Sequence, residues 1–129
     1  MQILEVNGLR KVYTTRFGGA SVEALKNINF SVENGEYVAI MGESGSGKSV
    51  SAMSILRLLD GNGYIDSGEI LFNGVGLTKL SMNEMYKIRG NEISVIFQEP
   101  MTSLNPVFTV SRQISEPLMI HQGMTKKQA

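Results

Sequence analysis

The chain has 129 residues, of which 42% are hydrophobic, with 12 basic and 12 acidic side chains. This ordinary globular composition is sufficient for one small α/β domain, and a net charge of zero gives no electrostatic argument for binding nucleic acid. The chain has no cysteine, which excludes disulfides, thiolate metal sites and cysteine nucleophiles.

The N-terminal part of the chain is predicted to be mainly strand. Residues 4–15 are rich in β-forming side chains, with a turn or bulge at Asn7 and Gly8, and residues 15–21 are predicted to form a loop. Residues 24–33 alternate apolar and polar side chains up to the turn pair Asn34 and Gly35. Residues 37–41, YVAIM, are continuously apolar, as is typical of a strand covered on both faces.

A helix and a hairpin are expected next. The apolar side chains of residues 48–60 recur at helical spacing, and the turn at Asp60 and Gly61 is expected to end this helix. Residues 68–77 are predicted to form a hairpin around Asn73 and Gly74.

The remaining residues are predicted to form helices around one more strand. Ser81 and Glu84 have the spacing of a capping box, which opens a short helix that Gly90 ends. Residues 92–97 are predicted to be a second buried strand. Residues 110–123 are predicted to be helical with a break near Pro117, and residues 124–129 to begin another helix. Together the elements predict an α/β plan with an antiparallel β layer.

Residues 42–49, GESGSGKS, fit the phosphate-loop pattern G-x-x-x-x-G-K-[ST] at every specified position. The glycines permit a close backbone approach, and the N–H groups from Ser44 to Ser49 can converge on phosphate oxygens at the start of the following helix. Lys48 is suited to the β- and γ-phosphates and the Ser49 hydroxyl to Mg²⁺. The alternative is a flexible turn between a strand and a helix. The candidate nucleotide-binding residues here are Gly42, Glu43, Ser44, Gly45, Ser46, Gly47, Lys48, Ser49 and Val50.

The predicted strand 92–97 is followed directly by an uncharged amide, Gln98. A loop bracketed by Pro100 and Pro106 comes next. An amide at a strand terminus can ligate a metal through oxygen or orient a water molecule without titrating. A glutamine that caps the strand and faces solvent is the competing interpretation, and from these residues alone the two remain open.

Beyond the phosphate loop, the stretches SILRLL, GEILFNG and above all FQEPMTSLNP are similar to those of ATP-binding subunits of ABC transporters, in particular the branch that imports oligopeptides and dipeptides (peptide and nickel importers). The resemblance runs from about Ile3 to Ala129. It implies a P-loop NTPase core, with an incomplete RecA-like sheet, joined to an antiparallel β layer and the start of a helical subdomain.

The same resemblance implies roles for single residues. Gln98 matches the glutamine that lies near the γ-phosphate and contacts Mg²⁺ or the attacking water, so Lys48 and Gln98 are the candidate catalytic residues and Ser49 and Gln98 the candidate metal ligands. Tyr13 matches an aromatic side chain that stacks on adenine. Val50 stands where the family commonly has threonine. The implied cofactors are ATP and Mg²⁺.

The implied partners are a second ATP-binding subunit, identical or different, and transmembrane permease subunits that loop 99–106 would face. An extracytoplasmic solute-binding protein would act indirectly, and nucleic acid is not implied. The corresponding location is the cytoplasmic face of a cell membrane, in a prokaryote.

Several family motifs do not occur after Gln98, namely a strand ending in Asp-Glu, an L-S-G-G-Q signature and a switch histidine. Asp60, Glu99 and His121 do not match them in position. We therefore expect residues 1–129 to be the N-terminal portion of a single ABC ATP-binding domain, preceding the signature and the Walker B strand, and to hydrolyse ATP poorly alone.

Two other classes of protein remain as alternatives. A catalytically inactive module that uses ATP as a switch would bind nucleotide without turnover. A GTPase or small-molecule kinase would also need the phosphate loop, but the N-K-x-D motif by which GTPases read the base does not occur in this sequence.

Overall fold

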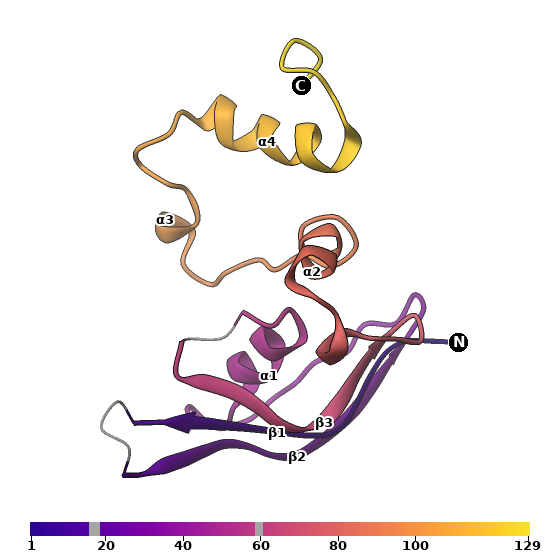
Figure 1. The fold of residues 1–129 in the computed structure, drawn as a ribbon, viewed down its shortest axis with the longest axis vertical. Helices are drawn as coiled ribbons and strands as arrows, with labels where there is room; N and C mark the ends of the chain where they lie inside the picture. Colours follow the sequence, from indigo (N-terminus) through magenta and orange to yellow (C-terminus); the bar gives the residue numbers. More distant parts are fainter. Residues whose placement is uncertain (16–18, 59–60) are drawn as a thin grey trace. The chain divides into compact units, whose positions relative to one another are not determined.

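A computed structural model describes residues 1–15, 19–58 and 61–129 and divides the chain into two compact units, Met1–Leu80 and Ser81–Ala129 (Figure 1). The elements of the first unit are β1 (Gln2–Thr14), β2 (Ser21–Glu33), α1 (Lys48–Ile55), β3 (Gly63–Phe72), β4 (Val75–Gly76) and the short 3-10 helix η1 (Leu77–Lys79).

The strands of the first unit form one antiparallel sheet in the order β2-β1-β3-β4, with the three long strands side by side (Figure 1). The predicted irregularity in β1 is a bulge, because the pairing with β2 shifts between Val6 and Leu9, and Gly8 has a φ of +58°. The predicted hairpin between β3 and β4 is confirmed, since Asn73 and Gly74 have φ values of +48° and +77°, as a tight two-residue turn requires.

A small apolar core lies against this sheet. Its buried members are Val6, Leu9, Val12, Leu25, Leu56, Ile70 and Leu77. One long polar side chain, that of Lys11, is equally buried, with 1% of its surface exposed.

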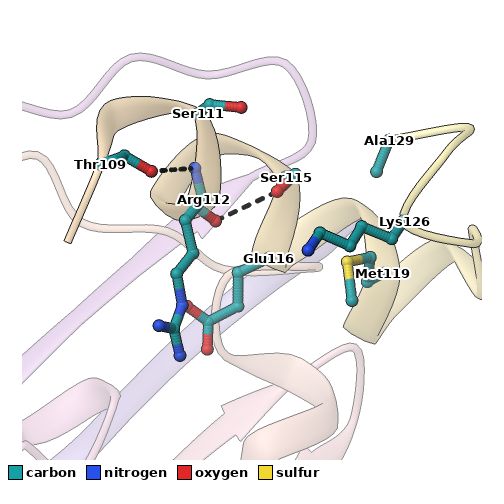
Figure 2. A pocket seen from close by; sticks show the side chains of 8 residues that line it. All are labelled: Thr109, Ser111, Arg112, Ser115, Glu116, Met119, Lys126 and Ala129. Atoms are coloured by element: carbon teal, nitrogen blue, oxygen red, sulfur yellow. Dashed lines mark hydrogen bonds between the residues drawn. The ribbon is translucent and has the colours of Figure 1, made fainter.

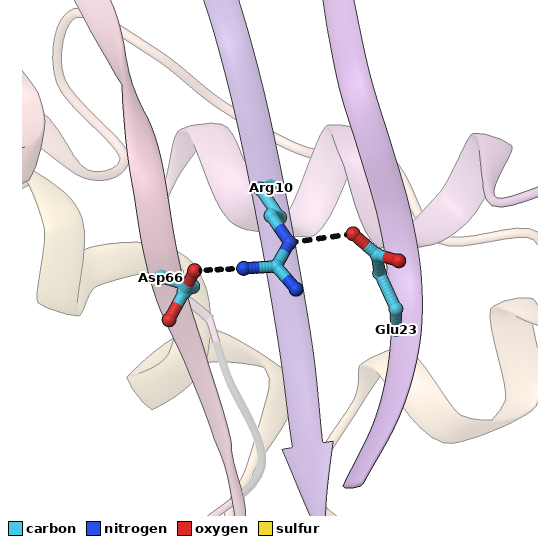
Figure 3. Close-up of polar contacts among 3 residues, drawn as sticks. All are labelled: Arg10, Glu23 and Asp66. Atoms are coloured by element: carbon cyan, nitrogen blue, oxygen red, sulfur yellow. Dashed lines mark hydrogen bonds and ion pairs between the residues drawn. The ribbon is translucent and has the colours of Figure 1, made fainter.

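The exposed side of the sheet carries a cross-strand charge cluster. Arg10 on β1 lies between Glu23 on β2 and Asp66 on β3, and donates hydrogen bonds to both carboxylates (Figure 3). The hydrogen bond to Glu23 and the charges of Glu23 and Asp66 raise the pKa of Arg10. Because the cluster is partly exposed, salt will screen it, and its contribution is to align three strands in register.

Helix α1 is shorter than the predicted helix 48–60. It ends at Ile55, because Arg57 adopts a left-handed conformation with a φ of +52°. The Arg57 guanidinium donates hydrogen bonds to the carbonyl groups of Leu77 and Leu80, which ties the end of α1 to η1. Residues 59 and 60, and residues 16–18 of the predicted loop 15–21, lie outside the described residues.

The second unit is helical, with α2 (Met82–Ile88), α3 (Pro100–Ser103) and α4 (Val110–Gln122). The predicted break near Pro117 is wrong, because α4 continues through this proline to Gln122. Thr109 accepts a hydrogen bond from the N–H of Arg112 at the start of α4, and Gly123, with a φ of +64°, ends it. Residues 126–128 form a turn rather than the predicted start of a helix.

The two predicted buried strands are also wrong. Residues 37–41 form no strand, and residues 92–97 form only an isolated bridge between Ile93 and Arg89. Tyr37 and Ile96 are fully or almost fully exposed, at 101% and 98%. A continuous apolar run becomes a strand when neighbouring strands accept and donate its backbone hydrogen bonds. Within residues 1–15, 19–58 and 61–129, no strand pairs with either segment.

The predicted capping box of α2 is present and makes the helix sensitive to pH. Glu84 accepts hydrogen bonds from the hydroxyl and the N–H of Ser81, at 2.7 and 2.8 Å, and these bonds lower the pKa of Glu84. A lowered pKa means that the stabilisation is complete above the usual pKa of a glutamate and is lost as the pH falls through the lowered value. We therefore expect α2 to fray in acid.

The Cα chemical shifts of residues 82–88, followed from about pH 7 to about pH 2, measure this effect. Glu84→Gln keeps an acceptor at the same position but does not titrate, so it should flatten the dependence. An equally steep acid transition in this variant would contradict the assignment to Glu84.

Candidate functional site

The phosphate-loop residues form a tight loop that ends at the first residue of α1. Gly45 and Gly47 have φ values of +83° and +94°, and the N–H of Ser46 donates to the carbonyl of Glu43 at 3.1 Å. Gly47 is the N-cap of α1 and brings no side chain to the helix start. The first N–H groups of α1 therefore have no side-chain cap and remain available to an anion.

Two glycines have steric reasons to be glycine. A Cβ on Gly47 would lie 2.9 Å from Cδ2 of Leu25, which is a buried residue of β2. A Cβ on Gly42 would lie 2.5 Å from the hydroxyl of Ser46, across the loop. Gly47 thus lies close to Leu25 of the sheet, and Gly42 lies close to Ser46 across the loop.

Lys48 folds back over its own loop. Its Nζ donates to the carbonyl groups of Gly42 and Glu43, at 2.7 and 2.8 Å, and to the hydroxyl of Ser46 at 3.3 Å. These contacts use all three protons of the ammonium group and hold one positive charge within the loop. The longest contact is the weakest, so a phosphate oxygen can take the place of the Ser46 hydroxyl at small cost.

Ser49 and Val50 complete the predicted loop at the start of α1. Ser49 is exposed, and the carbonyl of Val50 accepts a hydrogen bond from the hydroxyl of Ser54 at 2.6 Å. No cluster of three or more His, Asp or Glu side chains able to hold a metal occurs in the described part of the chain. The oxygen donors of a bound triphosphate would therefore have to complete a Mg²⁺ site at Ser49.

Tyr13 lies near the end of β1, where it pairs with Val22 on β2 and Gly63 on β3. Its side chain is half-buried, and its hydroxyl accepts a hydrogen bond from Nζ of Lys11 at 2.7 Å. Sequence reasoning did not identify Lys11 or Gly63, although the position of Lys11 two residues before Tyr13 on a strand puts both side chains on one face.

Gln98 belongs to the second unit, where it lies exposed in a bend, and its position relative to the phosphate loop remains a prediction. The loop after it contains α3 and is fixed at its far end by Gln113 of α4. This side chain accepts from the N–H of Asn105 at 2.8 Å and donates to the carbonyl groups of Asn105 and Phe108, each at 2.9 Å. No sequence motif marks Gln113, because the hydrogen bonds depend on how the loop folds.

The second unit also has a hollow of about 570 Å³ along α4 (Figure 2). Its walls include Arg112, Glu116 and Lys126, and it contains none of the predicted site residues. His121 lines a smaller hollow with Tyr86 and Asn91. The residues that line this hollow include no acidic side chain.

Comparison with known proteins identifies the class. Residues 25–129 match the ABC transporter family, and the chain belongs to this family. It is 47% identical to the dipeptide transport ATP-binding protein of Lactococcus lactis and 47% identical to the oligopeptide transport ATP-binding protein of Bacillus subtilis, in each case over 99% of this chain. The chain spans 36% of the length of these two curated relatives.

Solved structures agree with the predicted fold class. The chain is similar to a dimeric bacterial ABC transporter cassette, with a TM-score of 0.75 and 32% identity over 90% of this chain and 47% of that one. It is also similar to a dimeric cassette in a post-hydrolysis state with ADP and Pi, with a TM-score of 0.71 and 30% identity over the same shares. The P-loop NTPase fold with an antiparallel layer is therefore confirmed.

None of the described helices has the length and apolar character that crossing a membrane requires.

Proposed function

We propose that the chain is the N-terminal portion of a single ABC ATP-binding domain, in a subunit that couples ATP binding and hydrolysis to the uptake of peptides or similar small solutes. The observation that carries the proposal is the loop at Lys48, whose ammonium group is held between the carbonyls of Gly42 and Glu43 at an uncapped helix start. The names of relatives as transporters of dipeptides and oligopeptides support the choice of solute.

The phosphate end of the nucleotide would be bound by loop 42–49 and Val50. The backbone N–H groups from Ser44 to Ser49 and the charge of Lys48 would hold the β- and γ-phosphates. Ser49, together with Gln98, would hold Mg²⁺, which neutralises charge that develops on the phosphate oxygens. Tyr13 would stack on the base.

Hydrolysis would proceed by attack of water on the γ-phosphorus, with cleavage of its bond to the bridging oxygen of ADP, giving ADP and phosphate. Gln98 would orient the water or the metal without taking a proton, because an amide does not titrate. Lys48 would stabilise the charge on the transferred group. The ADP- and Pi-bound state of a similar cassette supports this reaction class.

Partners follow from the same proposal. A second ATP-binding subunit, identical or different, would complete the nucleotide site, as the dimeric state of similar cassettes supports. Loop 99–106 would contact the permease at the cytoplasmic face of the membrane, and a solute-binding protein would act through that permease. The hydrogen bonds of Gln113 to this loop would transmit its movement to α4.

A hydrolysis assay on the native-length protein, with whatever sequence flanks residues 1–129 in its source, tests the proposal. We expect Mg²⁺-dependent release of phosphate from ATP. Gln98→Ala should lower this rate by about 10- to 100-fold, the usual effect of disturbing a metal's surroundings, while ATP binding is largely kept.

Gln122→Ala, at an exposed position on α4, is the matched control and should leave the rate unchanged. Equal rates in the Gln98 and Gln122 variants would remove Gln98 from the mechanism. ATP binding without any turnover by the native-length wild type would favour the switch module.

A further inference from the structure

A buried lysine contacts the residue proposed to stack on the base. Lys11 exposes 1% of its surface, donates to the hydroxyl of Tyr13 at 2.7 Å and has its Nζ 4.5 Å from the centre of the Tyr13 ring. Lysine is rarely buried to this degree unless it is paired, because its charge loses hydration. The tyrosine supplies both a hydrogen-bond acceptor and an aromatic ring to this charge.

A glycine on the neighbouring strand makes room for this pair. A Cβ on Gly63 would lie 2.7 Å from Cε1 and 3.0 Å from Cδ1 of Tyr13, and 3.2 Å from Cε of Lys11. Gly63 is paired with Tyr13 in the sheet, so its missing side chain lets the ring lie close to β3. Lys11 therefore holds the hydroxyl end of the ring, and Gly63 leaves the space that the ring occupies beside β3.

The ring lies on the same face of the sheet as the phosphate loop. Lys11 pairs with Leu25, whose Cδ2 is the atom nearest to the Cβ position of Gly47. Paired residues of antiparallel strands share a face, and so do residues two apart, which the hydrogen bond from Lys11 to Tyr13 confirms. Tyr13 thus lies on the face of the sheet that carries the loop, two residues along β1 from the partner of Leu25.

We propose that Lys11 is a positioning residue for nucleotide binding, which holds the Tyr13 ring in one orientation so that its open face can stack on the base. The inference rests on the proposed function and deepens it. The ligand class is a nucleoside triphosphate, and the stacking does not distinguish one purine from another. Lys11 itself would not touch the nucleotide.

Titration of the native-length protein with Mg-ATP and with Mg-tripolyphosphate separates the base from the phosphates. We expect Lys11→Met, which keeps the length of the side chain, to weaken ATP binding about five- to tenfold. This loss is less than the full contribution of one stacked base to affinity. Tripolyphosphate binding should stay within about twofold, because the phosphate loop is intact. Lys26→Met, at an exposed position on β2, is the control and should change neither affinity.

Tyr13→Phe keeps the ring and removes the hydroxyl that Lys11 contacts. It should weaken ATP binding as much as Lys11→Met does, and the double variant should lose no more than either single one, because one interaction is removed in all three. Equal losses for ATP and tripolyphosphate in Lys11→Met, or no loss for ATP, would overturn the inference.

The titrations of the wild-type protein distinguish failure of this inference from failure of the proposed function. Wild-type protein that binds tripolyphosphate as tightly as ATP gains nothing from the base, which overturns the role of Lys11 and leaves the phosphate site standing. Wild-type protein that binds neither ligand overturns both.

Discussion

Replacing Lys48 by alanine is expected to lower ATP hydrolysis by the native-length protein at least about 100-fold, the usual effect of removing one preorganised group that stabilises transition-state charge. The variant loses the positive charge that the carbonyls of Gly42 and Glu43 hold in the loop. Those two carbonyls would also face the phosphates without a donor between them, so Mg-ATP binding should weaken as well. Phosphate release and nucleotide titration measure the two effects.

The control for this prediction is Lys79→Ala, since Lys79 is 81% exposed and its partner is Glu69, 3.6 Å away. It should leave both quantities unchanged. Lys48→Arg should not restore activity, because the planar guanidinium cannot reproduce the three contacts of the ammonium group. Wild-type rates in Lys48→Ala would contradict the assignment of the site.

Replacing Gly68 by alanine is expected to destabilise the protein by about 3 kcal/mol or more, in the range of severe backbone conflicts. Gly68 lies on β3 with a φ of +96°, and a Cβ there would be 2.5 Å from the carbonyl oxygen of Gly8 and 2.6 Å from Cα of Leu9. These are backbone atoms of β1 at its bulge, so relief requires the two strands to separate. Urea unfolding measures the loss.

Gly74→Ala separates the clash from the strain of the left-handed conformation. Gly74 has a φ of +77°, but nothing lies within 4 Å of its Cβ position, so its replacement should cost about 1 kcal/mol. Similar losses for the two variants would show that backbone conformation, rather than the contact with β1, makes glycine necessary at position 68.

Those parts of the fold that depend on local chemistry could be predicted from the sequence. The bulge at Gly8, the turn at Asn73 and Gly74, and the capping box at Ser81 each depend on residues that are close in sequence. The close approach at Gly68 could not be predicted, because its cause is a strand that lies about 60 residues earlier in the chain.

The two apolar runs at 37–41 and 94–97 show that local composition can also predict an element that does not form. Their composition indicates buried strands, but a strand exists only with a neighbour, and the described residues provide none. The predicted helix 48–60 extends beyond the true end of α1. Arg57 is left-handed, and its guanidinium binds the carbonyl groups of Leu77 and Leu80, which no local pattern predicts.

Some residues of the candidate site could likewise be predicted from the sequence and others could not. The residues of loop 42–49 are recognisable because the chemistry of phosphate binding specifies the residue type at four positions of this eight-residue stretch. Lys11 carries no such pattern, and its burial follows from the pairing of β1 with β2 and β3. Whether Gln98 reaches the nucleotide depends on the placement of the second unit, which no local pattern fixes.

The most direct measurement of the central claim is a titration of the native-length protein with Mg-ATP, followed by its backbone amide NMR signals. The account predicts that the amides of Ser44 to Ser49 shift most, since their N–H groups would donate to the phosphates. Signals near Tyr13 should also shift with ATP but not with tripolyphosphate. Bound ATP that leaves the amides of Ser44 to Ser49 unshifted would contradict the account.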